Sequence, residues 1–119
     1  MVKGELEDNR PYITIPIRWG GRVQDIPALI DTGFDGDVRV SHEEAKYLNL
    51  ITEHVQVLEF ADGSAKDVPG SIGYSEFNGV VNLVNITILD GGATIGMGFL
   101  KKFNAILTIN LKQKSVTIS

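Results

Sequence analysis

The stretch Ala28-Leu29-Ile30-Asp31-Thr32-Gly33 constrains the fold of this chain more than any other part of the sequence. Its three apolar residues are typical of a buried strand, and they run directly into a carboxylate. An aspartate at the end of a buried strand is costly unless its charge is hydrogen-bonded or paired. Gly33 then indicates a tight turn or a close approach of another group to the backbone. We therefore expect the surroundings of Asp31 to set its proton affinity, as they do for catalytic carboxylates.

Length and charge limit what such a chain can be. A chain of 119 residues corresponds to one domain, residues 1–119, and can bury about two-thirds of its unfolded surface. The net charge of −4 and the pI near 5.0 argue against a general nucleic-acid binder, which usually has a basic face. The absence of cysteine excludes disulfides and thiol chemistry and removes the usual ligands of structural zinc. We expect no metal, no cofactor and no nucleic-acid partner.

The sequence also carries no sign of a membrane or secretory protein. No apolar run approaches the roughly 20 residues that span a bilayer. The segment Met1–Asp8 is acidic and lacks the apolar core of a signal peptide. Asn85-Ile86-Thr87 matches a glycosylation sequon, which we interpret as chance because no secretory signal accompanies it. We expect a cytoplasmic protein that does not bind membranes.

Alternating apolar residues predict a mostly β domain. Strands are expected at Tyr12–Ile17, from Val23 to Ile30, and at Val38–Val40, Val55–Phe60, Ala65–Val68, Ser71–Phe77, Val80–Leu89, Ala105–Leu111 and Ser115–Ile118. Gly20-Gly21 predicts a hairpin turn between the first two. Pro16 indicates an edge or strand-end position, because proline cannot donate to a strand ladder.

One or two short helices are expected beside the strands. Ser41-His42-Glu43-Glu44 is a capping box, in which the serine hydroxyl and the Glu44 carboxylate satisfy free amides at a helix start. The helix is predicted to run to about Leu48, with Ala45 facing inward. Phe99 and Phe103 lie four residues apart and indicate a second, very short helix that buries both rings.

Two motifs together resemble the aspartic proteases, and most closely the small retropepsin-like group. Asp31-Thr32-Gly33-Phe34-Asp35-Gly36 resembles the active-site loop of that family. Thr94-Ile95-Gly96-Met97-Gly98-Phe99-Leu100 resembles the apolar-Gly motif that leads into its short C-terminal helix. The family's flap, a hairpin that folds over the substrate, would fall on Val57–Lys66. The resemblance covers about Tyr12–Ile118, and within the group the chain is similar to single-domain bacterial and archaeal members. It implies an all-β retropepsin-like acid protease barrel.

This resemblance implies an aspartic endopeptidase that acts as a homodimer on a peptide or protein substrate. In such enzymes a water molecule lies between two aspartates that share one proton. One carboxylate is the general base, and its protonated partner polarises the scissile carbonyl. The chain contains a single Asp-Thr/Ser-Gly, because neither Asp62-Gly63-Ser64 nor Asp90-Gly91-Gly92 has a hydroxyl residue after the acid. Asp31 of one copy would therefore face Asp31 of a second copy across a two-fold axis.

The resemblance also assigns roles to individual residues. Asp31, Thr32 and Gly33 would form the catalytic loop, with Thr32 hydrogen-bonding across the axis and Gly33 offering its carbonyl to the substrate. Phe34 and Asp35 would contact the substrate together with the tip of the flap. The tip residues expected to bind substrate are Phe60, Ala61, Asp62, Gly63 and Ser64. The terminal strands expected to form a sheet between the subunits are Val2–Leu6 and Ser115–Ile118.

The sequence departs from the family pattern at three positions. Phe34 stands where retroviral members usually have a small residue, which would reshape the substrate groove. Met97 stands where they carry an arginine paired with the acid equivalent to Asp35, so that ion pair is absent. Cellular relatives often have Asp or Asn at the position of Gly98. These differences bear on peptide specificity and dimer strength more than on the chemistry of Asp31.

Other interpretations of the same residues remain open. Asp35 and Asp37 also fit a solvated turn, since aspartate and glycine favour turns. Trp19, beside a glycine turn, fits either packing or a dimer edge. The whole fold could also serve a different class of function, a non-proteolytic homodimeric module that holds a peptide or partner in the flap groove.

Two further motif matches are rejected. A calcium-binding loop starting at Asp31 would need acids where Gly33 and His42 stand. A dinucleotide fingerprint starting at Gly96 has Lys101 in place of its third glycine, and no βαβ unit surrounds it. Neither match indicates a binding site.

Overall fold

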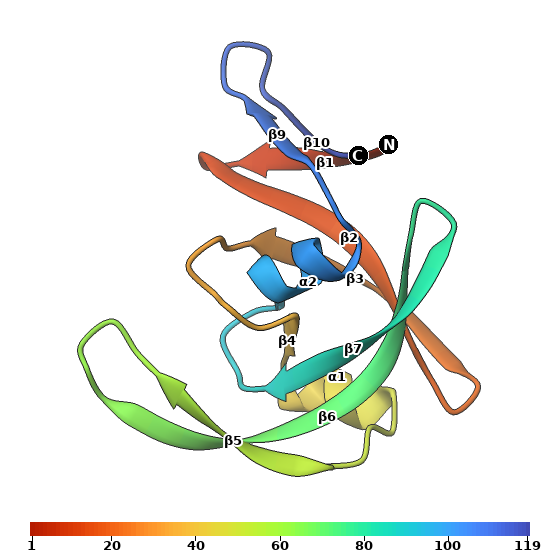
Figure 1. Ribbon diagram of the computed structural model, residues 1–119, viewed down its shortest axis with the longest axis vertical. Helices are drawn as coiled ribbons and strands as arrows, with labels where there is room; N and C mark the ends of the chain where they lie inside the picture. Colours follow the sequence, from red (N-terminus) through yellow and green to blue (C-terminus); the bar gives the residue numbers. More distant parts are fainter.

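The computed structural model describes residues 1–119 and consists of strands with two short helices (Figure 1). The elements are β1 (Val2–Glu7), β2 (Arg10–Trp19), β3 (Arg22–Ile30), β4 (Val38–Val40), α1 (His42–Tyr47), β5 (His54–Glu59), β6 (Ala65–Phe77), β7 (Val80–Ile88), β8 (Thr94–Ile95), α2 (Met97–Lys102), β9 (Leu107–Asn110) and β10 (Ser115–Ile118). The mostly β prediction is confirmed. Neither helix has the length and apolar character that crossing a membrane requires.

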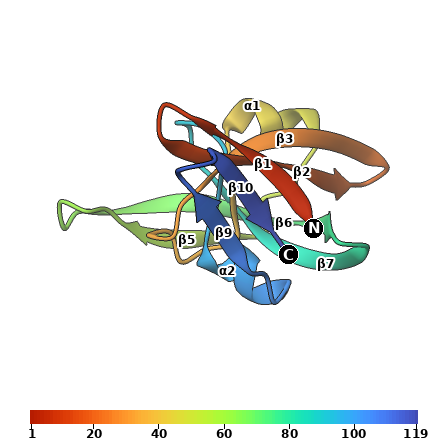
Figure 2. The same cartoon turned by 90° about the horizontal axis from the view of Figure 1, so that it is seen from above.

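The strands form one sheet that closes on itself. Their order is β5-β6-β7-β4-β8-β3-β2-β1-β10-β9, and β6 also pairs with β2, which joins the two sides of a barrel. The hairpin β5–β6 projects from one end of this barrel, and β1, β10 and β9 extend from the other (Figures 1 and 2). The barrel therefore lies between a protruding hairpin and a layer built from the chain termini.

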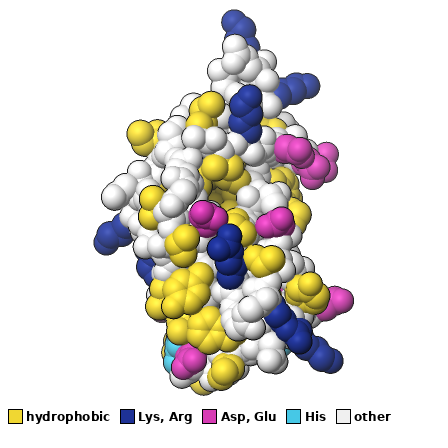
Figure 3. Space-filling model, turned by 90° about the vertical axis from the view of Figure 1, so that its right-hand side faces the viewer, with side chains coloured by type: hydrophobic (Ala, Val, Ile, Leu, Met, Phe, Trp, Pro, Cys, Tyr) yellow, Lys and Arg dark blue, Asp and Glu magenta, His cyan; other side chains and the backbone are white.

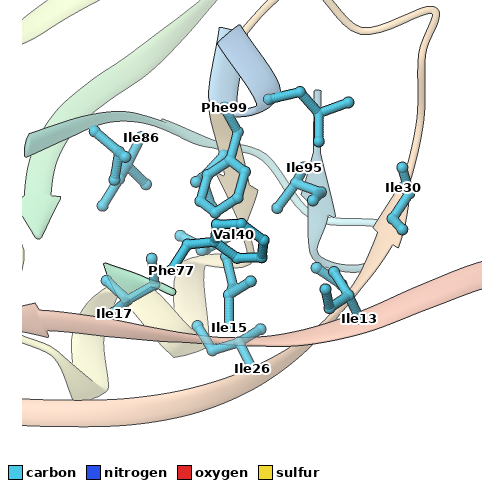
Figure 4. Packing of buried hydrophobic residues seen from close by; sticks show 14 of the residues in the cluster. Ile13, Ile15, Ile17, Ile26, Ile30, Val40, Phe77, Ile86, Ile95 and Phe99 are labelled. Atoms are coloured by element: carbon cyan, nitrogen blue, oxygen red, sulfur yellow. The ribbon is translucent and has the colours of Figure 1, made fainter. Parts of the chain in front are cut away.

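A cluster of 19 buried residues fills the barrel. Alternate residues of β2 supply Ile13, Ile15 and Ile17, each at most 2% exposed, as the period of two in a strand requires. Phe99 enters from α2 and is fully buried, and Figure 4 shows its ring pointing towards Val40. The core thus anchors α2 directly above the strands of the barrel.

The local sequence signals form the expected structures. Gly20 and Gly21 have φ of 57° and 81° and connect β2 to β3, a turn that residues with a Cβ rarely adopt. At the start of α1, the Glu44 amide donates to Ser41 Oγ at 3.1 Å, and the Ser41 amide donates to Glu44 Oε1 at 2.9 Å. The predicted capping box is therefore present, and Ala45 is buried behind it.

The division of residues 65–77 into two strands is wrong. Pro69 and Gly70 lie inside β6, opposite Val55 and His54 of β5. Pairing with β7 begins only at Gly70, so Pro69 has a neighbouring strand on one side alone. A proline is tolerated where one side of a strand is unpaired. One continuous strand therefore passes from the protruding hairpin into the barrel.

Pro16 is likewise not at an edge or a strand end. It lies in the middle of β2, opposite Asp25 of β3. On the other side of β2, pairing with β1 ends at Tyr12, and pairing with β6 begins at Ile17. Pro16 occupies the interval between these two neighbours, where its missing amide leaves no ladder bond unmade.

The strands near the termini pair within the chain. Val116, Thr117 and Ile118 of β10 are opposite both β1 and β9, so both backbone edges of β10 are already occupied. A sheet that included β10 and continued into a second subunit would therefore have to extend through another strand, and the terminal strands stay candidates for such a sheet. At this end of the sheet the free edge belongs to β9.

Candidate active site

Asp31 is the first residue after β3 and lies exposed on the loop that leaves the barrel. Ala28 and Ile30 of β3 are buried, which fixes the strand up to the acid. The Asp31 amide donates to the Ile95 carbonyl at 2.9 Å. Its carboxylate oxygen Oδ1 accepts the Gly33 amide at 2.9 Å. The side chain is thus oriented by its own loop while remaining open to a substrate or a second carboxylate.

The second motif holds this loop in place. β8 lies between β3 and β4, so Ile95 is opposite both Ile30 and Val38. The Gly96 amide donates to the Asp37 carbonyl at 3.0 Å, and the Met97 amide donates to the Phe34 carbonyl at 2.8 Å. These bonds join the two motifs that resemble one family, although nearly half the chain separates them.

Glycine at position 96 is required by this contact. A Cβ built there would overlap the carbonyl oxygens of Phe34 and Gly36. The backbone at Gly96 has φ of −119°, which any residue can adopt, so the constraint is space and not conformation. The close approach of the two motifs therefore depends on a missing side chain.

The turn before β8 is fastened from the opposite side. Asp90 Oδ1 accepts the His42 amide at 2.9 Å and contacts the His42 ring Nδ1 at 3.1 Å. These bonds, with the backbone amide first, lower the pKa of Asp90 below its usual value. Arg39 donates to the Leu89 carbonyl at 3.0 Å and to the Asp90 carbonyl. The second motif thus starts from a turn that β4 and α1 both bind.

Asp37 differs from Asp35, although both were compatible with a solvated turn. Asp35 is exposed, as a turn residue would be. Asp37 is only 6% exposed, and its Oδ2 accepts the Asn85 amide at 2.8 Å and lies 2.6 Å from Lys102 Nζ. The solvated-turn interpretation is therefore wrong for Asp37. Nothing in the sequence distinguishes Lys102 as the partner of a buried acid. Lysine is common in the last turn of a helix, because its charge interacts favourably with the helix dipole there.

A groove opens beside the Asp31 loop. Its volume is about 480 Å³, and Gly33, Phe34, Asp35 and Gly36 line one wall while Gln56 to Glu59 of β5 line the other. At its base, Thr87 Oγ1 donates to Gln56 Oε1 at 2.8 Å. The predicted substrate residues Phe34 and Asp35 both border this groove.

The predicted hairpin is present, but its tip lies away from the groove. The tip, residues 60–64, connects β5 to β6 and projects from the barrel (Figure 2). The Gly63 amide donates to the Phe60 carbonyl at 2.9 Å, and Asp62 Oδ1 accepts from the hydroxyl and amide of Ser64 at 2.6 and 2.8 Å. The hydroxyl bond is the main reason that the pKa of Asp62 is lowered. Phe60, Ala61, Asp62, Gly63 and Ser64 do not line the groove, and β5 lines it instead.

A second concavity lies on the other side of the loop. It has a volume of about 410 Å³ and a mostly apolar lining that includes Thr32, Met97, Leu100 and Leu107. Thr32 therefore faces this concavity, while the next residue, Gly33, faces the groove. No three or more His, Asp or Glu side chains are grouped so that they could hold a metal ion.

Comparison with known proteins identifies the architecture. No family model and no curated protein matches the sequence. A solved structure of a retropepsin-like aspartic protease from Rickettsia conorii superposes with a TM-score of 0.72, covering 99% of this chain and 88% of that one. The fold is the retropepsin-like fold. Sequence identity over the match is 14%. The similarity therefore concerns the fold, and most residues of the barrel differ between the two proteins.

Proposed function

We propose that this chain is an aspartic endopeptidase that works as a homodimer. The observation that supports this most directly is the position of Asp31. Its exposed carboxylate stands where the loop passes from an apolar concavity, lined by Thr32, to the groove that Gly33 lines. A second copy on the first side and a peptide on the second would both reach the same acid.

Peptide hydrolysis would then follow from two Asp31 carboxylates and one water. Two carboxylates that share one water molecule repel each other when both are ionised, so the pair would keep one proton over a range of acidic pH. The ionised member takes a proton from the water, and the protonated member hydrogen-bonds the scissile carbonyl oxygen. The attacking oxygen bonds to the carbonyl carbon and gives a tetrahedral intermediate. The C–N bond then breaks, and a proton from the aspartate pair passes to the nitrogen of the leaving amine. Activity is expected to be highest at acidic to mildly acidic pH.

The face that would meet the second copy is apolar around the Thr32 concavity. Met97 and Ile106 are 46% and 65% exposed, and Ile109 on β9 is 42% exposed. Burying such side chains stabilises association by about 25 cal/mol per Å² of apolar area. The free edge of β9 supplies backbone groups for a strand pair with its counterpart. By contrast, hydrophobic side chains on the face drawn in Figure 3 are interspersed with charges of both signs.

The hairpin β5–β6 would act as a mobile cover. Its tip is held only by bonds within residues 60–64, and Phe60 is 38% exposed. Closure over a bound peptide would exclude water from the reacting groups, as mobile lids do. The tip residues predicted to bind substrate would reach it in that closed form.

The test compares Asp31→Asn with Asp25→Asn. Asp25 is an exposed aspartate in β3, the strand that leads to Asp31, so the control removes the same charge outside the loop. Cleavage of a mixed peptide library is measured between pH 3 and 7, with and without pepstatin. We expect wild type and Asp25→Asn to cleave with equal rates, and Asp31→Asn to lose at least about 1000-fold, the order seen when an essential catalytic group is removed.

Two outcomes would oppose the proposal. Cleavage that survives in Asp31→Asn would show that another group is responsible. A well-folded dimer that binds peptides in the groove but cleaves none of them would favour the non-proteolytic binding module on the same fold.

A further inference from the structure

The only charged side chain among the buried residues is Asp37. It closes the loop that begins at Asp31 and leads directly into β4. A buried carboxylate is tolerated only when its charge is paired and its oxygens are hydrogen-bonded. Both conditions are met through Oδ2, which accepts the Asn85 amide of β7 and pairs with Lys102 Nζ at the end of α2.

Lys102 is held in turn from several sides. Its ammonium group also donates to the Leu83 carbonyl at 3.0 Å, and its own carbonyl accepts the Asn82 side-chain amide at 3.0 Å. The last turn of α2 is thus bound to β7 at the same point where it reaches Asp37. Charge-assisted hydrogen bonds of this kind are shorter and stronger than neutral ones.

Both ends of α2 therefore bind the Asp31 loop, each at a different point. At the first turn, the amides of Met97 and Gly98 donate to the carbonyls of Phe34 and Gly36 at 2.8 and 3.1 Å. At the last turn, Lys102 binds Asp37. A Cβ at position 98 would overlap Asp37 Oδ1, so glycine there admits the carboxylate between helix and loop.

We propose that Asp37 and Lys102 are positioning residues for the reaction, an inference that rests on the proposed function. Neither residue borders the groove, so neither would touch the substrate. Their ion pair fixes the exit of the loop, while the Gly33 amide orients Asp31 near its entrance. With Asp37 taking the internal charge pair, Asp35 stays exposed on the groove wall and available to substrate.

The decisive variants are Lys102→Met, Asp37→Asn and Lys102→Arg. Lys102→Met leaves a buried carboxylate without its counter-charge, whereas Asp37→Asn leaves a lysine that is 35% exposed and can turn to solvent. We expect kcat to fall about 10- to 100-fold in Lys102→Met, as expected for a misplaced reacting group, and less in Asp37→Asn. KM should change less than kcat, by under about threefold, because neither substituted residue lines the groove.

Recovery of kcat by a conservative variant distinguishes a positioning role from a general loss of structure. Lys102→Arg restores a cation that can donate to Asp37 and should recover most of kcat. The double variant Asp37→Asn/Lys102→Met removes both charges and should be less impaired than Lys102→Met alone. Arg18→Met is the matched control, because it removes an ion pair with Glu76 that lies exposed on the surface, and kcat should stay at the wild-type value.

Amide hydrogen exchange tests the same inference without any cleavage assay. In Lys102→Met the amides of Gly96 and Gly98, which bond to the loop, should exchange at least about tenfold faster, while those of β10 should not change. If the wild-type chain proves to cleave nothing, the proposed function fails and this measurement alone still decides whether the ion pair holds the loop. Unchanged exchange at Gly96 and Gly98, or an unchanged kcat in folded Lys102→Met, would overturn the inference.

Discussion

Lys102 Nζ lies 2.6 Å from Asp37 Oδ2, and this contact joins the last turn of α2 to the end of the Asp31 loop. The pair is asymmetric, because the Asp37 side chain is 8% exposed and that of Lys102 is 35% exposed. Loss of one partner therefore has a different cost from loss of the other. Removing the lysine leaves a buried carboxylate without a counter-charge, whereas removing the carboxylate leaves a lysine that can reach solvent.

This asymmetry predicts the order of stabilities. Lys102→Met should lower the free energy of unfolding by about 2–3 kcal/mol, the cost of an unpaired charged group. Asp37→Asn should lower it by about 1 kcal/mol, since the amide oxygen can still accept from Asn85. Urea unfolding at pH 7 measures both, with Arg18→Met changing stability by less than about 0.5 kcal/mol as an exposed pair. Equal losses in the first two variants would contradict the asymmetry.

Gly96→Ala should damage the contact between the two motifs. The added methyl group overlaps the Phe34 and Gly36 carbonyls, so either β8 or the loop must move, at a cost of about 1–3 kcal/mol. Gly79→Ala is the comparison, because its surroundings are open and only its φ of 77° opposes a side chain, which costs about 1 kcal/mol. Thermal unfolding gives the stabilities. A Gly96→Ala chain with wild-type stability and with wild-type hydrogen exchange at the Asp31 amide would show that the loop tolerates the methyl group.

The hairpin tip should hold its charge at acidic pH. The Ser64 hydroxyl, followed by the Ser64 amide, lowers the pKa of Asp62 below 3.8. A carboxyl with a lowered pKa binds fewer protons in the folded than in the unfolded chain. Its stabilising contribution is therefore complete above the unfolded pKa and is lost as the pH falls through the folded pKa. The tip should keep its Asp62–Ser64 bonds at pH 4–7 and lose them only below about pH 3.8.

Carboxyl-carbon NMR of Asp62 measures this directly. Ser64→Ala should raise the pKa of Asp62 towards 3.8, because it removes the largest of the causes. Thr14→Ala removes an exposed hydroxyl from β2 and should leave the titration of Asp62 unchanged. A Ser64→Ala chain in which Asp62 titrates as in wild type would refute the assignment of the hydroxyl as the main cause.

Ile109→Lys tests the face proposed for dimer formation. A charge at this exposed position on β9 would have to be buried when two copies pair, and a buried unpaired charge opposes association. We expect sedimentation to show monomers at concentrations where wild type is dimeric, with cleavage lost and the monomer still folded. Val23→Lys, at a residue that is 51% exposed in β3 near the Gly20-Gly21 turn, should remain dimeric. A dimeric and active Ile109→Lys would place the interface elsewhere.

The sequence predicted well those features that are set by neighbouring residues. The turn at Gly20-Gly21, the capping box at Ser41 and the hairpin around Asp62 each depend on a few consecutive side chains. The motifs at Asp31 and Gly96 were predicted to belong together only through a family resemblance. Periodicity alone gives no reason for residues so far apart to meet.

Features set by partners distant in the chain were missed. Pro16 suggested an edge or a strand end, because a sequence does not show which side of a strand is unpaired. The burial of Asp37 depends on Lys102 and Asn85, which come from two other elements. The second edge of β10 pairs with β1, which comes from the opposite end of the chain.

The Asp31 loop donates a backbone hydrogen bond to Ile95 and accepts others from Gly96, Met97 and Gly98, all of which follow it far along the chain. A growing polypeptide that had only reached β7 would contain the complete first motif without these four partners. The loop would therefore reach its final shape only after β8 and α2 had been synthesised, long after its own residues.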